Sequence, residues 1–80
     1  MRWQDHITSD PAVLAGKPII SGTRISVEFL LTLMASGWPQ EKILAEYPQL
    51  SAQAIEAALV FAAEAVEHEL VYPVRRPGAA

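Results

Sequence analysis

The stretch Gly16–Ser26, GKPIISGTRIS, decides the fold of this 80-residue chain. Two short runs, Pro18–Ile20 and Thr23–Ser26, flank the dipeptide Ser21-Gly22. Glycine adopts positive φ without a Cβ clash, so this dipeptide marks a turn. The sequence therefore predicts a β-hairpin. Because proline donates no hydrogen bond to a neighbouring strand, we expect Pro18 to open an edge strand.

Two of the six basic residues, Lys17 and Arg24, lie in this hairpin. They can bind an anion or a carboxylate, or they can be solvated cations that discourage edge-to-edge pairing of strands. We expect Arg24 to hold the ribbon by pairing with a nearby carboxylate, Asp10 or Glu28.

The hairpin needs helices to cover it, because a two-stranded ribbon is barely stable alone in water. Ahead of it, Asp10 is placed to cap a single turn, Pro11–Leu14, which Gly16 ends. After it, the apolar spacing predicts three helices. They run from Val27 to about Ser36, from Gln40 to about Tyr47, and from Ala52 to about Leu70, with Ser26 and Ser51 as N-caps and Gly37 and Pro48 as stop signals.

The third helix has two apolar faces. The inner face is predicted to be formed by Ile55, Ala58, Leu59, Ala62 and Val66. A second face, formed by Ala57, Phe61 and Ala65, is expected to bury a second copy of the chain in a homodimer. The alternative is that these alanines reflect helix propensity alone.

Length and composition indicate one domain over residues 1–74, followed by a flexible tail over residues 75–80. Hydrophobic residues make up 51% of the chain, so some apolar surface is expected to stay outside the core and bind a partner. Cysteine is absent, which excludes a disulfide framework. Without a signal peptide or a membrane span in the pattern, we expect a cytoplasmic protein with no membrane contact.

The charge balance favours a basic protein partner over nucleic acid. The net charge is −3, and the third helix carries Glu56, Glu64, Glu67 and Glu69 but no lysine or arginine. Two helices joined by a short turn nevertheless form a helix-turn-helix candidate. The side chains that could contact DNA are Lys42, Gln49, Ser51 and Gln53, and ordinary capping or solvation is the alternative for each.

Catalytic chemistry is not expected. The histidines, His6 and His68, lie at opposite ends of the chain, and no cysteine accompanies them. Neither a glycine-rich phosphate loop nor a metal-ligand cluster appears in the pattern, so we expect no cofactor and no enzyme activity.

The motifs SDP, then GKP, two residues and GTRI, then YPQLS resemble the bacterial family called domain of unknown function 433. The similarity covers roughly residues 7–63. It implies a homeodomain-like, mainly α fold with three helices behind a short N-terminal hairpin. The matched positions, whose role is expected to be structural, are Asp10, Gly16, Lys17, Pro18, Gly22, Thr23, Arg24, Pro48 and Leu50. Trp38 and Pro39 depart from the family pattern.

The resemblance also implies an antitoxin-like role beside a PIN-like nuclease. Our leading hypothesis is therefore a homodimeric antitoxin that sequesters this toxin and binds its own promoter DNA. The third helix and the segment Val71, Tyr72, Val74, Arg75 and Arg76 would cover the toxin. The alternatives are a free-standing DNA-binding transcriptional regulator and an oligomerisation module without a separate ligand.

Overall fold

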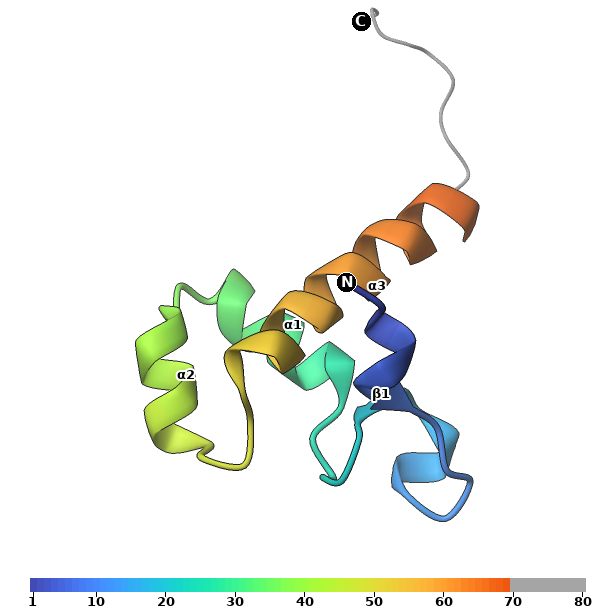
Figure 1. Cartoon of the computed structure of the whole chain (residues 1–80), viewed down its shortest axis with the longest axis horizontal. Coiled ribbons are helices and arrows are strands. Elements are labelled where there is room, and N and C mark those ends of the chain that lie inside the picture. The colour runs from blue at the N-terminus through green and yellow to red at the C-terminus, as the bar shows by residue number, and fades with distance from the viewer. Residues whose placement is uncertain (70–80) are drawn as a thin grey trace, which may run out of the picture.

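Three helices follow a two-stranded antiparallel sheet in the computed structural model, which describes residues 1–69 (Figure 1). The elements are η1 (Trp3–Asp5), β1 (Ile7–Thr8), η2 (Leu14–Gly16), β2 (Ile19–Ile20), α1 (Val27–Ala35), α2 (Gln40–Glu46) and α3 (Ala52–Glu69). The mainly helical fold expected from the sequence is thus confirmed. The expected contacts of Val71, Tyr72, Val74, Arg75 and Arg76 lie outside the described residues.

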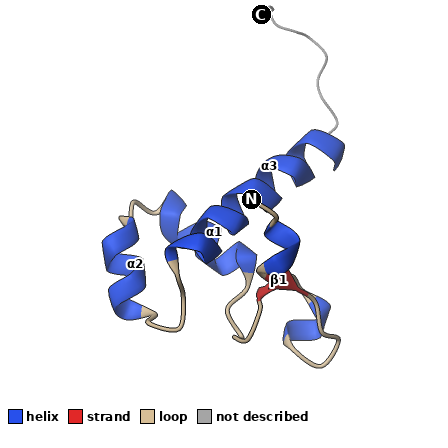
Figure 2. Cartoon of the chain, in the orientation of Figure 1, coloured by secondary structure: helices blue, strands red, loops and turns tan. Residues whose placement is uncertain are grey.

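The strand Ile19–Ile20, which belongs to the small sheet drawn in red in Figure 2, is bonded on both sides. It pairs with β1 in the register Ile7 opposite Ile20, and it also forms an isolated bridge between Ile19 and Ser26. The expected edge position was therefore wrong. Pro18 is tolerated because it precedes the strand, where its carbonyl accepts a hydrogen bond from the N–H of Val27 at 3.0 Å.

The turn after β2 follows the sequence signal. The N–H of Ile20 donates to the carbonyl of Ile25 at 2.9 Å, so the two arms of the expected hairpin do meet. Thr23 stabilises the turn twice, since its hydroxyl donates to the Ile20 carbonyl at 2.8 Å and accepts from the Ile25 N–H at 2.9 Å. Gly22 has φ of +80°, a conformation that glycine adopts without strain.

The loop between the strands differs from the expected Pro11–Leu14 turn. Asp10 does cap the chain, because its carboxylate accepts a hydrogen bond from the N–H of Ala12 at 2.9 Å. The helical turn itself comes later, at Leu14–Gly16, and both Leu14 and Ala15 have positive φ. Asp10 therefore begins a separate turn, in which the N–H of Val13 donates to the Asp10 carbonyl, and no helix starts there.

Local signals define the helix ends. The hydroxyl of Ser26 accepts a hydrogen bond from the N–H of Phe29 at 2.9 Å and caps α1. The hydroxyl of Ser51 accepts from the N–H of Ala54 at 3.1 Å and caps α3. Gly37, with φ of +93°, follows the end of α1.

The core lies where the three helices meet the sheet. Leu30 of α1 and Ile43 of α2 are its largest fully buried side chains. The expected inner face of α3 is only partly correct, since Ile55 and Ala58 are buried whereas Leu59 and Val66 are 50% and 54% exposed. The C-terminal turns of α3 extend beyond the rest of the fold, which leaves Val66 uncovered (Figure 1).

The N-terminal turn covers the other side of α3. The indole N–H of Trp3 donates to the carboxylate of Glu64 at 2.9 Å, across 61 positions of sequence. The Trp3 ring also lies edge to face with Phe61, with centroids 4.8 Å apart. The N-terminus is therefore attached to the second half of α3.

Candidate interaction surface

The two cations of the hairpin have different environments. Lys17, on the loop before β2, pairs with Glu28 in the first turn of α1 at 3.0 Å. Arg24 is exposed and makes no ion pair within residues 1–69, so its expected pairing with Asp10 or Glu28 was wrong. Lys17 occupies the carboxylate of Glu28, and Arg24, next to the turn, is left in solvent.

Of the four side chains proposed to contact DNA, three lie at the α2–α3 connection and the first turn of α3, whereas Lys42 lies near the start of α2. Gln49 and Gln53 are exposed there, whereas the Ser51 hydroxyl caps α3. The ammonium of Lys42 lies 4.3 Å from the centroid of the Trp38 ring, a cation–π contact. Ser51 and Lys42 thus have structural contacts of their own, and a role for this group in DNA binding stays a prediction.

An aromatic cluster joins α1 to α2, and the sequence pattern gave no signal for it. Tyr47 lies edge to face with Phe29, with ring centroids 5.6 Å apart, and its ring is 6.4 Å from that of Trp38. Together with Lys42, these rings fix the short helix α2 against α1. The unusual Trp38 at the start of α2 therefore has a packing role.

The face expected to form a dimer is divided by the fold. Ala57 is fully buried in the core, so it cannot contact a second chain, and that part of the expectation was wrong. Phe61 and Ala65 are half-buried because Trp3 and the N-terminal turn lie over this side of α3. The large apolar side chains that α3 does expose are Leu59 and Val66.

The polar side of α3 is acidic. Glu56, Glu64 and Glu67 are all exposed, and at about 100° per residue they fall within about 80° of the helix circumference. No lysine or arginine lies on α3. This side therefore attracts cationic groups and repels phosphates.

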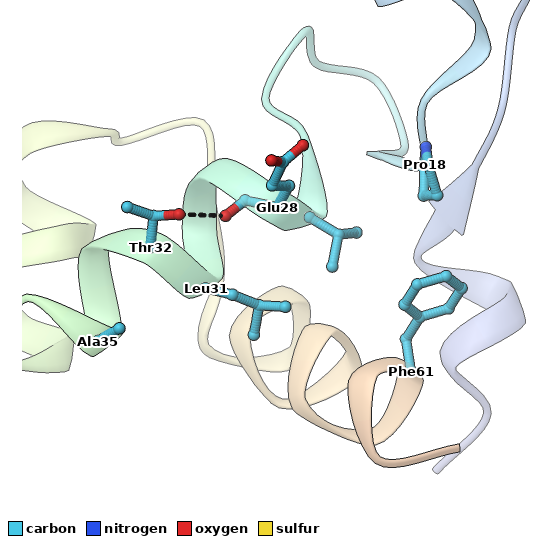
Figure 3. Close-up of a pocket in the computed structure, with 7 residues that line it drawn as sticks. Pro18, Glu28, Leu31, Thr32, Ala35 and Phe61 are labelled. Atoms are coloured by element: carbon cyan, nitrogen blue, oxygen red, sulfur yellow. Dashed lines mark hydrogen bonds between the residues drawn. The ribbon is translucent and has the colours of Figure 1, made fainter. Parts of the chain in front are cut away.

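An apolar groove of about 380 Å³ opens between α1 and α3 (Figure 3). Leu31 and Phe61 form opposite walls, and Pro18 closes one end. The hydroxyl of Thr32 donates to the backbone carbonyl of Glu28 at 2.9 Å, so this polar group at the groove has its own partner. The complete lining is Pro18, Val27, Glu28, Leu31, Thr32, Ala35 and Phe61.

Two features of residues 1–69 bear on other functions. Nowhere in this part of the chain do three or more histidine, aspartate or glutamate side chains gather as they would around a metal ion. Among the helices of the same residues, none combines the length and the apolarity needed to cross a membrane.

The fold is that of a small, mainly helical domain with three helices behind a short two-stranded antiparallel sheet. The sequence profile of a protein family described as "Protein of unknown function (DUF433)" matches residues 7–62. The chain belongs to this DUF433 family, as the GKP and GTRI motifs indicated.

Two relatives support this assignment. A crystal structure of a DUF433 member protein from Anabaena variabilis superimposes with a TM-score of 0.74 at 34% identity, covering 80% of this chain and 63% of that one. An uncharacterised protein of Sinorhizobium fredii, y4eO, is 36% identical over 59 residues, which are 74% of this chain and 27% of the relative. The chain thus spans about a quarter of the length of the curated relative.

Proposed function

We propose that this protein is an antitoxin-type binding protein that sequesters a basic partner protein, a PIN-like nuclease toxin, and has no catalytic activity of its own. The observation that supports this most directly is the row of exposed carboxylates on α3. A nuclease must hold a polyanion and therefore has a basic substrate groove, to which this face is complementary. Covering that groove would inhibit the nuclease by occlusion.

The apolar groove beside the acidic face strengthens the proposal. Charge complementarity mainly accelerates encounter and adds specificity, whereas buried apolar contacts supply most of the affinity. The groove between Leu31 and Phe61 offers such contacts next to Glu64. A partner that contacts both the acidic face and the apolar groove would be held by electrostatic attraction and by burial of apolar surface.

Co-expression with the product of the neighbouring gene tests the proposal. We expect the two proteins to co-elute from size-exclusion chromatography and the complex to lose nuclease activity that the free partner shows. Replacing Glu56 and Glu67 by lysine should slow association severalfold, because rim charges act on the association rate. Separate elution of the two proteins at micromolar concentration would overturn the proposal.

A DNA-binding role is the second candidate, either as autoregulation by the antitoxin or as a free-standing transcriptional regulator. It is favoured by the exposed Gln49 just before α3 and Gln53 in its first turn, because the start of the second helix of a helix-turn-helix usually enters the major groove. Titration of upstream DNA at about 50 mM salt tests it, where phosphate contacts are strong. Binding should be lost in a Gln53→Ala, Lys42→Glu variant, and a flat titration of the unchanged protein would exclude this role.

A homodimer is part of the proposal. We propose that its interface is formed by Leu59 and Val66 instead of the face expected from the sequence. Leu59 and Val66 lie about 20° apart on the helical wheel and on the side of α3 away from Phe61. Pairing of two α3 helices through these side chains would leave the groove open to the toxin. An oligomerisation module without any separate ligand would use the same contact.

A further inference from the structure

We infer that Phe61 separates two adjacent subsites, an apolar groove and an aromatic–carboxylate pocket, which together bind an amphipathic helix that carries a lysine or arginine beside its apolar face. This inference rests on the proposed binding of a basic partner protein and names the surface and the kind of segment involved. The main observation behind it is that the Phe61 ring lines both cavities.

The first subsite is the groove between α1 and α3. Its volume of about 380 Å³ lies within the range of about 300–1,000 Å³ typical of ligand pockets. Leu31, Ala35 and the Phe61 ring present carbon surface to it (Figure 3). Because its walls are two helices, the groove suits the apolar side chains of a helix that lies along them.

The second subsite lies on the other side of Phe61. It has a volume of about 200 Å³ and is lined by Trp3, Phe61, Glu64, Ala65 and His68. Two aromatic rings stand edge to face there, and the indole N–H holds one carboxylate oxygen of Glu64 at 2.9 Å. A guanidinium or ammonium favours such a pair of surfaces, since it can lie on a ring and bond a carboxylate at the same time.

The charges give the bound helix a direction. At the Pro18 end of the groove, Lys17 already neutralises Glu28 at 3.0 Å. Beyond Phe61, in the second subsite, Glu64 accepts a hydrogen bond from the neutral indole of Trp3, and no cation among residues 1–69 pairs with its charge. The cation of the partner therefore belongs beside Glu64, on the far side of Phe61 from the apolar anchor in the groove.

Synthetic peptides test the inference on the full-length protein. We would use a peptide of about 15 residues, made of leucine, alanine and lysine, with the leucines on one helical face. A second peptide has the same composition in a shuffled order without an apolar face, and a third has glutamate in place of lysine. Binding is followed by NMR, where the Trp3 indole N–H reports on the second subsite and that of Trp38, on the α2 side, is the internal reference.

Only the first peptide is expected to shift the Trp3 indole and the amides of Leu31 and Ala35, with Trp38 unchanged. Equal shifts from the shuffled peptide would mean nonspecific attraction to an acidic protein and would overturn the inference. So would binding that moves Trp38 and leaves Trp3 in place.

Matched variants separate the two subsites. Ala35→Lys puts a cation into the groove and should weaken the peptide about fivefold or more, whereas Ala45→Lys makes the same change on exposed α2 and should leave binding unchanged. Glu64→Gln keeps an acceptor for the Trp3 indole and should weaken binding about two- to fivefold, against no effect for Glu46→Gln. The inference would be overturned if Ala35→Lys bound the peptide as tightly as Ala45→Lys and Glu64→Gln bound it as tightly as Glu46→Gln.

The same variants separate this inference from the proposed function. If the neighbouring gene product forms a complex that neither Ala35→Lys nor Glu64→Gln weakens, the two-subsite surface is wrong and the antitoxin role stands. If the gene product fails to bind while the amphipathic peptide binds as expected, the antitoxin role is wrong and the surface stands.

Discussion

At the scale of single residues, Gly22 is a position where backbone conformation alone sets the cost of a substitution. Its φ is +80°, and a Cβ built there would meet no atom within 4 Å. We expect Gly22→Ala to lower the free energy of unfolding by about 1–2 kcal/mol, because the left-handed region is strained for an L-residue. Gly22→Asn should cost less, since asparagine tolerates this region. Urea denaturation measures both, and equal losses would contradict the argument.

Ser26 tests the cap of α1 in the same way. Its hydroxyl accepts from the Phe29 N–H, so Ser26→Ala should lower the free energy of unfolding by about 1 kcal/mol. Ser36, after the end of α1, is exposed, and among the described residues its side chain makes no hydrogen bond. Ser36→Ala is therefore the control and should change thermal stability little. A loss for Ser36→Ala as large as for Ser26→Ala would show that the cap is not the cause.

These residue positions could be predicted from the sequence because their signals are local. Gly22, Ser26 and Ser51 each act on backbone within a few positions of themselves, which a short window of sequence contains. The predicted pairing of Arg24 with Asp10 or Glu28 was wrong, because the sequence does not show which of several carboxylates a surface cation will reach. Lys17 comes from a different segment and takes Glu28 instead.

At the scale of elements, strand pairing was the least predictable feature. The turn at Ser21-Gly22 was identified correctly, yet the strand partner of Ile19–Ile20 is Ile7–Thr8, which precedes it by a long loop. Such pairing is nonlocal, and two-residue strands carry no periodicity that could reveal it. Within the lead-in, the apolar Ile7 was identifiable as an anchor and is buried in the core, but its strand partner was not.

Helix α2 depends on a single buried side chain. A helix of seven residues is too short to be stable alone, and Ile43 is the residue that it buries completely. Ile43→Ala should therefore lower the free energy of unfolding by about 2–5 kcal/mol. Leu44→Ala, on the same helix but half-buried, should cost clearly less. Chemical denaturation of both variants checks this order, and the reverse order would contradict the argument that Ile43 anchors α2.

At the scale of the whole molecule, α3 has more apolar faces than the rest of the chain can cover. The sequence showed both faces, but it could not show which of them the chain would bury. Trp3, 61 positions away from Glu64, decides this by covering the Phe61 side, while Leu59 and Val66 stay exposed. The candidate groove and pocket were likewise beyond the sequence pattern, because their walls come from segments far apart in the chain.

The exposed face of α3 leads to a prediction about assembly. Two apolar side chains seven positions apart lie on one side of a helix that extends beyond the fold, and pairing two such helices would remove them from water (Figure 1). We expect light scattering to give a mass of about twice 8.7 kDa at high micromolar concentration. Leu59→Glu should shift the protein to monomer because two carboxylates would then face each other, whereas Ala45→Glu, exposed on α2, should leave the dimer intact.

The dimer variant also shows whether the two faces of α3 act separately. Phe61 lies about 140–160° around the helix from Leu59 and Val66, so loss of the dimer should leave the groove unchanged. Leu59→Glu is therefore expected to bind the amphipathic leucine–lysine peptide with the same affinity per chain as the unchanged protein. A monomer that no longer binds this peptide would show instead that the second copy helps to form the site. A mass of 8.7 kDa for the unchanged protein at every concentration would exclude the dimer altogether.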